Sequence, residues 1–159
     1  MSTNASNEPV IVRPREGEKV RLAGNEIAFK LTGEQSGGAF SVVEYTAAPN
    51  FEAPPVLHAN ALEAWAGYVL EGALVFEFSG GRRFTAQTGA FLFLPKGEMF
   101  KWWNETDSQA RWLCIYSPAG FENYFREVSR IIEDFPPENF DIKQAMPQIL
   151  LLWLKYGIE

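Results

Sequence analysis

The chain has 159 residues, which is enough for one domain with a sizeable buried core. Hydrophobic residues make up 47% of it and aromatic residues 14%, a composition typical of globular rather than disordered proteins. Its 14 basic residues are outnumbered by 20 acidic ones, for a formal net charge of -6, and they are scattered. The sequence therefore gives no support to nucleic-acid binding.

Features that would indicate export or a membrane partner are missing from the sequence. Cys114 is the single cysteine, so no intramolecular disulfide can form, which suits a reducing compartment. Residues 1–9 are polar, lack the pattern of a secretory signal and are expected to form a disordered tail. The apolar run 149–154 is far shorter than the roughly 20 residues that cross a bilayer. We expect a soluble, cytoplasmic protein.

Residues 10–117 have the pattern of an antiparallel sandwich or barrel. Short apolar or alternating runs separated by glycine-containing turns predict strands at 10–12, 19–22, 27–31, 40–46, 65–70, 73–78, 82–86, 90–94, 100–103 and 110–116. Residues 33–38 are a turn cluster, and 49–55 form a loop that leads to His58. The run Phe91 to Leu94 is apolar at every position, so we expect this strand to be buried on both faces.

Residues 118–159 have helical rather than strand periodicity. Phe121, Tyr124, Phe125 and Val128 repeat at the spacing of an amphipathic helix over 120–132. A second helix is expected to begin near Pro147 and to end before Gly157. Because this helix is apolar almost all round, we expect it to pack on the barrel and also on a second subunit of a homodimer.

The segment from Pro54 to Asn104 contains two passages with the spacing of the paired cupin motifs. Other stretches, including Tyr68-Val69-Leu70-Glu71-Gly72 and Ser117-Pro118-Ala119-Gly120-Phe121, are similar to those of single-domain cupins of the quercetin-dioxygenase-like group. The resemblance implies an all-β fold, a single jelly-roll cupin barrel with C-terminal α-helices.

The resemblance also implies positions for metal ligands. The first cupin motif has two histidines, a glutamate and then a glycine seven residues later; counted back from Gly72, these positions hold His58, Asn60 and Trp65. The third histidine position holds Phe100. A carboxamide is a weak ligand, and indole and phenyl rings are none. Glu63 is displaced by two residues, roughly 6 to 7 Å along an extended strand, so we expect no metal and no cofactor.

The substituted positions predict a cavity walled by aromatic rings. If the inherited inward positions still face inward, Trp65 and Phe100 project into the barrel, and the period of two adds Trp102. Trp112 is expected to join them, and Gly67, in phase with Trp65, to leave room for a flat ligand. The alternative is that these rings plug a barrel without a cavity. Tyr68 has the opposite phase and is expected outside, under a helix.

The chain's single histidine, His58, would carry any imidazole chemistry and, as catalytic residue, would move a proton with the help of Asn60 or Glu63. The alternative is that His58 is an inert relic of the ligand set. The leading hypothesis is a metal-independent cupin that binds an aromatic or polycyclic small molecule and catalyses a cofactor-independent cyclisation, isomerisation or elimination in natural-product biosynthesis. A non-catalytic binding or sensory cupin is the second hypothesis. A metal-dependent dioxygenase is the third, disfavoured by the missing ligands.

Overall fold

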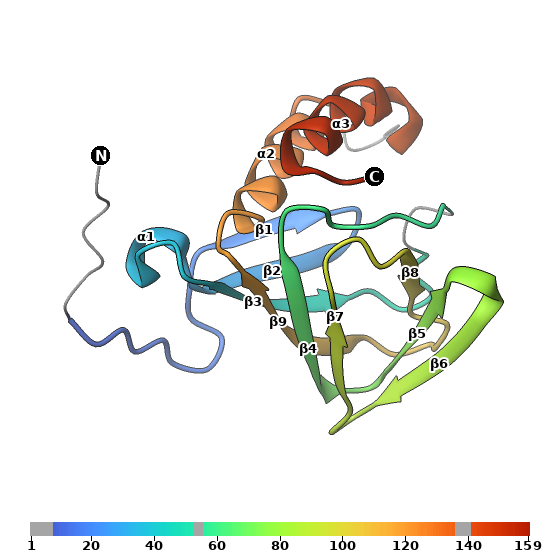
Figure 1. The fold of residues 1–159 in the computed structure, drawn as a ribbon, viewed down its shortest axis with the longest axis horizontal. Helices are drawn as coiled ribbons and strands as arrows, with labels where there is room; N and C mark the ends of the chain where they lie inside the picture. The colour runs from blue at the N-terminus through green and yellow to red at the C-terminus, as the bar shows by residue number, and fades with distance from the viewer. Residues whose placement is uncertain (1–7, 53–55, 136–140) are drawn as a thin grey trace.

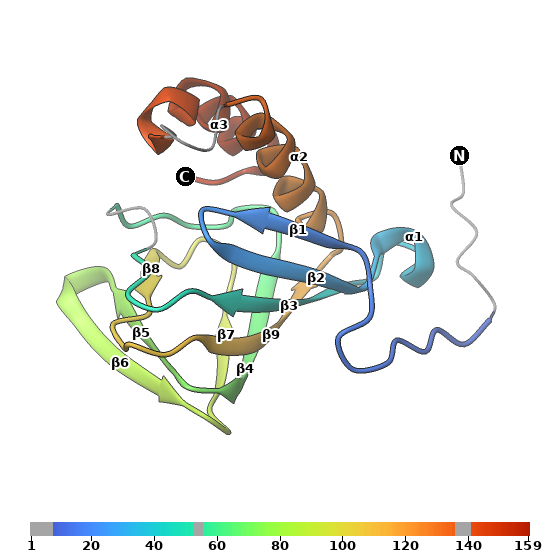
Figure 2. The same cartoon turned by 180° about the vertical axis from the view of Figure 1, so that it is seen from behind.

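A computed structural model of the chain describes residues 8–52, 56–135 and 141–159. Its strands are β1 (Lys19–Leu22), β2 (Asn25–Leu31), β3 (Ser41–Ala47), β4 (Ala64–Glu71), β5 (Ala73–Phe78), β6 (Arg82–Gln87), β7 (Phe91–Leu94), β8 (Phe100–Trp103) and β9 (Ala110–Ser117). They form a six-stranded sheet in the order β1-β2-β3-β9-β4-β7 and a three-stranded sheet in the order β6-β5-β8. All pairings between these strands are antiparallel, and the two sheets enclose the core (Figures 1 and 2).

Four strands of the six-stranded sheet, β3, β4, β7 and β9, bury alternate residues, as expected where one face of a sheet packs on a core. In β3 the buried residues are Ser41, Val43, Tyr45 and Ala47. In β9, which pairs with both β3 and β4, they are Ala110, Trp112, Cys114 and Tyr116. The all-β barrel with C-terminal helices that the sequence predicts is confirmed.

Helices cover one end of the barrel (Figure 1). α1 (Gly33–Ser36) is a single turn, η1 (Ser79–Gly81) is a 3-10 turn, and α2 (Glu122–Glu133) and α3 (Ile142–Tyr156) follow the last strand. The predicted start of α3 near Pro147 is wrong, because Asp141 caps the helix by accepting a hydrogen bond from the Lys143 N–H at 3.0 Å. Its end is as predicted, with Gly157 in the left-handed conformation at φ 62°. Within the described residues, no helix is both long and apolar enough to span a bilayer.

Two other expectations differ from the structure. Residues 10–12 form no strand, since the run is too short to bury a face, and Ile11 is exposed. β7 is buried on one face only: Leu92 and Leu94 point into the core, while Phe91 and Phe93 are exposed on the outer face. A uniformly apolar strand has no period-two signal that would show which face is covered.

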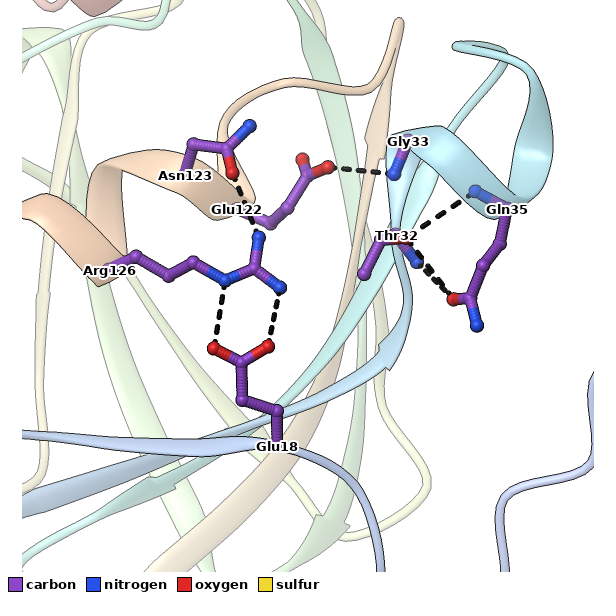
Figure 3. A network of polar contacts seen from close by, with 7 residues as sticks. All are labelled: Glu18, Thr32, Gly33, Gln35, Glu122, Asn123 and Arg126. Carbon is purple, nitrogen blue, oxygen red and sulfur yellow. Dashed lines mark hydrogen bonds and ion pairs between the residues drawn. The ribbon is translucent and has the colours of Figure 1, made fainter. Parts of the chain in front are cut away.

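A polar network fixes α2 to the barrel (Figure 3). The buried carboxylate of Glu122, the first residue of α2, accepts hydrogen bonds from the Gly33 N–H at 2.8 Å and the Gly120 N–H at 2.7 Å. One turn later, the guanidinium of Arg126 donates two hydrogen bonds to the Glu18 carboxylate, at 3.0 and 2.8 Å. These contacts set the position of α2 over the open end of the barrel.

The predicted division into a tail at 1–9, a barrel at 10–117 and a helical segment at 118–159 stays a prediction. Residues 1–7 lie outside the described residues, the strands lie between 19 and 117, and α2 and α3 lie between 122 and 156.

Candidate functional site

A cavity of about 720 Å³ lies between the inside of the barrel and the two C-terminal helices. We call it the chamber. Aromatic side chains from the strands line it: Tyr45, Trp65, Phe100, Trp102, Trp112 and Tyr116. From the helical segment come further apolar side chains, among them Phe121, Phe125, Met146, Ile149 and Trp153. All four aromatic residues predicted as ligand-binding therefore line one cavity.

Those four rings form a continuous cluster. The Trp65 ring centroid lies 5.3 Å from that of Phe100 and 5.4 Å from that of Trp112. The Trp112 ring in turn lies 5.3 Å from that of Trp102, with the planes inclined at 63°. Edge-to-face contacts at these distances hold aromatic rings in defined orientations. The wall of the chamber is therefore a packed ring assembly rather than a set of independent side chains.

Gly67 does not leave room for a ligand, contrary to expectation. A Cβ atom at this position would lie 3.0 Å from the Trp112 ring and 3.1 Å from the Trp65 ring. The missing side chain thus makes space for these two indoles, which pack over the glycine backbone. Tyr68, its neighbour, lies outside the barrel as predicted but is exposed and not buried under a helix.

His58 is held in place by main-chain hydrogen bonds on both sides of its segment. Its N–H donates to the Phe100 carbonyl at 2.9 Å, and the Phe100 N–H donates to the His58 carbonyl at 2.8 Å. The next residue, Ala59, exchanges a matching pair of bonds with Glu159, at 2.9 and 3.0 Å. The segment thus bridges β8 and the C-terminal residues, and the imidazole stands 4.6 Å from the Phe100 ring and 5.9 Å from the Trp153 ring.

Burial among these rings lowers the pKa of His58 from its ordinary value, while the Val56 carbonyl acts in the opposite direction. The ring is therefore neutral near pH 7. Nδ1 lies 3.4 Å from the Val56 carbonyl oxygen. In the tautomer that donates this bond, Nε2 carries the lone pair and can accept a proton.

Asn60 and Glu63 lie together, but only Asn60 is among the described residues that line the chamber. The Asn60 amide donates a hydrogen bond to Glu63 Oε1 at 2.8 Å. Both side chains are buried, and loss of water raises the pKa of Glu63, although the Asn60 bond lowers it. Glu63 therefore fixes the orientation of the Asn60 amide.

Two tyrosines, Tyr45 and Tyr116, also line the chamber. Burial raises the pKa of Tyr45 and of Tyr116, so both hydroxyls stay protonated and can donate hydrogen bonds. Tyr45 is in phase with Val43 on the inner face of β3, which is the signal that could have found it. The chamber residues of the helices are harder to predict from the sequence. An amphipathic pattern shows that one face of a helix is buried, but it does not show which surface that face packs against.

The described residues do not fit the metal site that the resemblance to cupins implies. The four positions at which the resemblance implies ligands hold His58, Asn60, Trp65 and Phe100, and the last two contribute packed rings to the chamber wall. In the described part of the chain, no three or more histidine, cysteine, aspartate or glutamate side chains gather where they could hold a metal ion. A single imidazole beside an amide supplies too few donors for a transition metal, so no step is assigned to a metal.

Comparisons with known proteins agree with this architecture. Residues 43–116 match the family model described as a cupin domain. Similar solved structures include a predicted oxalate decarboxylase from Thermotoga maritima, with TM-score 0.60 and 22% identity over 68% of this chain and 98% of that chain. A polyketide cyclase from Streptomyces resistomycificus has TM-score 0.53 and 20% identity over 65% and 70% of the two chains. A nucleoside dehydratase has TM-score 0.56 and 15% identity over 73% and 88%.

No curated protein matches the chain. At identities this low, the likeness to solved structures shows the fold alone. The chain has a fold consistent with the cupin jelly roll, and residues 43–116 are the part that matches the family model.

Proposed function

We propose that this protein is a metal-independent cupin whose chamber binds an aromatic or polycyclic small molecule. The observation that supports this most directly is the chamber itself, about 720 Å³ in volume and walled by tilted and edge-on rings. Binding sites for small molecules typically measure roughly 300 to 1,000 Å³ and are mostly apolar. A flat, apolar ligand would exchange water for ring contacts over most of its surface.

The polar groups of the chamber favour an uncharged ligand with one or two oxygen or nitrogen atoms. His58, Asn60, Tyr45 and Tyr116 offer neutral donors and acceptors. The charged side chains that contribute to the lining, Glu52 and Lys143, are both exposed. A charged group deep in the chamber would lose its hydration without gaining an opposite charge.

His58 is the residue to which we assign proton transfer. A neutral imidazole in an apolar cavity can take a proton from one atom of a bound ligand and return it to another, as cyclisation, isomerisation and elimination require. The aromatic wall would hold a flexible substrate in one reactive geometry. Two of the solved structures with this fold are a polyketide cyclase and a nucleoside dehydratase. Their names describe a cyclisation and a loss of water, which are reactions of the proposed kind.

A non-catalytic binding or sensory role is the alternative, and the position of Glu63 favours it. Because Glu63 supports Asn60 instead of lining the chamber, His58 lacks the second acid-base group that the sequence had suggested. The two roles differ in where a bound ligand places its ionisable atom. A catalyst holds that atom within hydrogen-bond reach of the His58 imidazole, whereas a binder has no such requirement.

Two neighbouring tryptophans provide a matched test of the binding proposal. Trp102 and Trp103 are both half-buried on β8, but Trp102 lines the chamber whereas Trp103 lies by Arg83 and Lys101 and is not among the lining residues. With 2-naphthol as a neutral bicyclic probe, isothermal titration calorimetry should show saturable binding. Trp102→Ala should raise the dissociation constant of the probe about tenfold or more, because loss of the ring contact removes about 1.4 kcal/mol of binding free energy.

Trp103→Ala should bind the probe like the natural chain. Equal effects of the two substitutions, or no saturable binding of the probe by the unchanged protein, would contradict the proposal. Circular dichroism of both variants establishes that each is folded.

A further inference from the structure

Tyr124 on α2 lines the chamber from the side of the helices, as a third tyrosine beside Tyr45 and Tyr116. Its hydroxyl oxygen accepts a hydrogen bond from Trp153 Nε1 on α3 at 3.1 Å. An indole N–H can only donate, so the hydrogen of the Tyr124 hydroxyl must point away from Trp153. Among the residues that the structure describes, none accepts this hydrogen. The Tyr124 hydroxyl can therefore donate a hydrogen bond to a molecule in the chamber.

The two chamber tyrosines of the strands lack such an orienting bond. The Tyr116 hydroxyl has the buried Cys114 thiol as its neighbour, and both burial and this neighbour raise its pKa. No described residue donates a hydrogen bond to the Tyr45 hydroxyl, so the direction of its hydrogen is not fixed. Tyr124 is thus the chamber tyrosine whose hydroxyl is oriented by a donor.

Two opposing effects act on the acidity of Tyr124. Burial raises the pKa of its hydroxyl above the ordinary value, and the hydrogen bond from Trp153 lowers it. The net shift is upward, so the hydroxyl keeps its hydrogen near pH 7. Because the Trp153 N–H stabilises negative charge on the phenol oxygen, it also makes the Tyr124 hydroxyl a stronger hydrogen-bond donor.

Trp153 brings Tyr124 and His58 to the same part of the chamber. Its indole ring lies 5.9 Å from the His58 ring, between centroids, and its Nε1 is bonded to the Tyr124 hydroxyl. All three side chains line the chamber. With Nδ1 directed at the Val56 carbonyl, His58 presents a hydrogen-bond acceptor at Nε2, whereas Tyr124 presents a donor. A ligand that packs against Trp153 therefore meets one group of each kind.

From these contacts we propose that His58 and Tyr124 act as a pair on a neutral bicyclic or polycyclic ketone. His58 removes a proton from the carbon next to the carbonyl group, while Tyr124 donates a hydrogen bond to the carbonyl oxygen. This inference rests on the proposed function, to which it adds a substrate class and a second catalytic residue. Tyr124 takes the place of Glu63, which bonds to Asn60 and does not line the chamber.

The proposed step is an enolisation that needs no group beyond the ligand and the two side chains. The proton moves from carbon to His58 Nε2, and the electron pair of the broken C–H bond forms a carbon–carbon double bond. The π electron pair of the carbonyl moves to its oxygen, where the hydrogen bond from Tyr124 stabilises the negative charge. Return of the proton to the same carbon exchanges it with solvent, and return to another carbon of a conjugated ring isomerises the ketone.

Deuterium exchange at carbon tests the proposal with 2-tetralone, a neutral bicyclic ketone that has C–H groups next to its carbonyl. Proton NMR in deuterium oxide follows the loss of these hydrogens at a saturating concentration of the ketone. We expect the natural chain to exchange them faster than buffer alone, and His58→Gln to lose this acceleration. Tyr124→Phe should lower the exchange rate by about tenfold to a hundredfold. Its dissociation constant for the ketone should change by less than about fivefold, since the bond to the uncharged carbonyl is weaker.

Tyr156→Phe is the matched control. The Tyr156 ring lies 5.8 Å from the Tyr124 ring, between centroids, but its hydroxyl bonds to Glu127, and Tyr156 is not among the described residues that line the chamber. This variant should exchange the ketone hydrogens like the natural chain. Circular dichroism of all three variants establishes that each is folded.

Infrared spectroscopy measures the hydrogen bond to the bound ketone directly. The carbonyl stretching band of 2-tetralone should lie at lower frequency in the natural chain than in Tyr124→Phe, because the hydrogen bond weakens the C=O bond. Binding without accelerated exchange, or equal exchange rates in Tyr124→Phe and Tyr156→Phe, would overturn this inference and leave the binding role of the chamber intact. No saturable binding of either 2-tetralone or 2-naphthol would overturn the proposed function itself, and this inference with it.

Discussion

Protonation of the His58 imidazole should make a measurable contribution to the pH dependence of the free energy of unfolding. Burial lowers its pKa below the ordinary 6.5, so the unfolded chain binds a proton at a higher pH than the folded chain does. The free energy of unfolding should therefore fall as the pH drops through and below 6.5, until the folded state is protonated as well. Urea unfolding of the natural chain and of His58→Gln from pH 7.5 to 5, with pH steps of about 0.5, measures this.

The substitution is selective because His58 is the only histidine in the chain. Burial raises the pKa of Glu63, which gives the opposite sign, since its proton is bound more tightly in the folded state. That contribution is present in both proteins and cancels in their difference. The natural chain should lose stability relative to His58→Gln as the pH falls, and parallel curves would show that the imidazole is as solvated as in the unfolded chain.

The element that most needs a specific anchor is α2, because it closes one side of the chamber. Replacing Glu122 with alanine leaves the partly buried N–H groups of Gly33 and Gly120 without their acceptor. A fully buried donor without a partner costs roughly 1 to 3 kcal/mol, and water can reach these two in part, so we expect Glu122→Ala to lower the free energy of unfolding by about 2 to 4 kcal/mol in total. Chemical denaturation measures this difference.

Glu34 provides the control, since it is an exposed glutamate on the neighbouring α1. Glu34→Ala should change the free energy of unfolding by no more than about 0.5 kcal/mol. Equal stabilities of the Glu122 and Glu34 variants would mean that the network does not fix α2.

Most elements could be predicted from the sequence, and the errors have identifiable causes. The position of β3, a strand with alternating residues, was predicted to within one residue: the expected range was 40–46, and the strand is Ser41–Ala47. The position of β7 was predicted correctly, but its exposed face was not, because all four of its residues are apolar. The start of α3 was misplaced because Pro147 was taken as the first turn, although Asp141 provides a side-chain cap earlier in the chain.

At the scale of the whole molecule, the sequence predicted part of the chamber wall that the barrel provides. Inward strand positions follow from periodicity and motif spacing, so Trp65, Phe100, Trp102 and Trp112 could be named in advance. The contribution of the helices could not, because it depends on how α2 and α3 dock over the open end of the barrel. Neither could the packing of two indoles over Gly67, which depends on distances between side chains of β4 and β9.

We propose that the aromatic chamber inside this barrel binds a small molecule. A crystal structure of the full chain with 2-naphthol, at concentrations near its dissociation constant, tests this most directly. We predict electron density for the bicyclic ring inside the chamber, against Trp102 and between the barrel and α3. Density for the probe only on the outer surface, with the side chains of Trp65 and Phe100 occupying the space inside the barrel, would contradict the proposal.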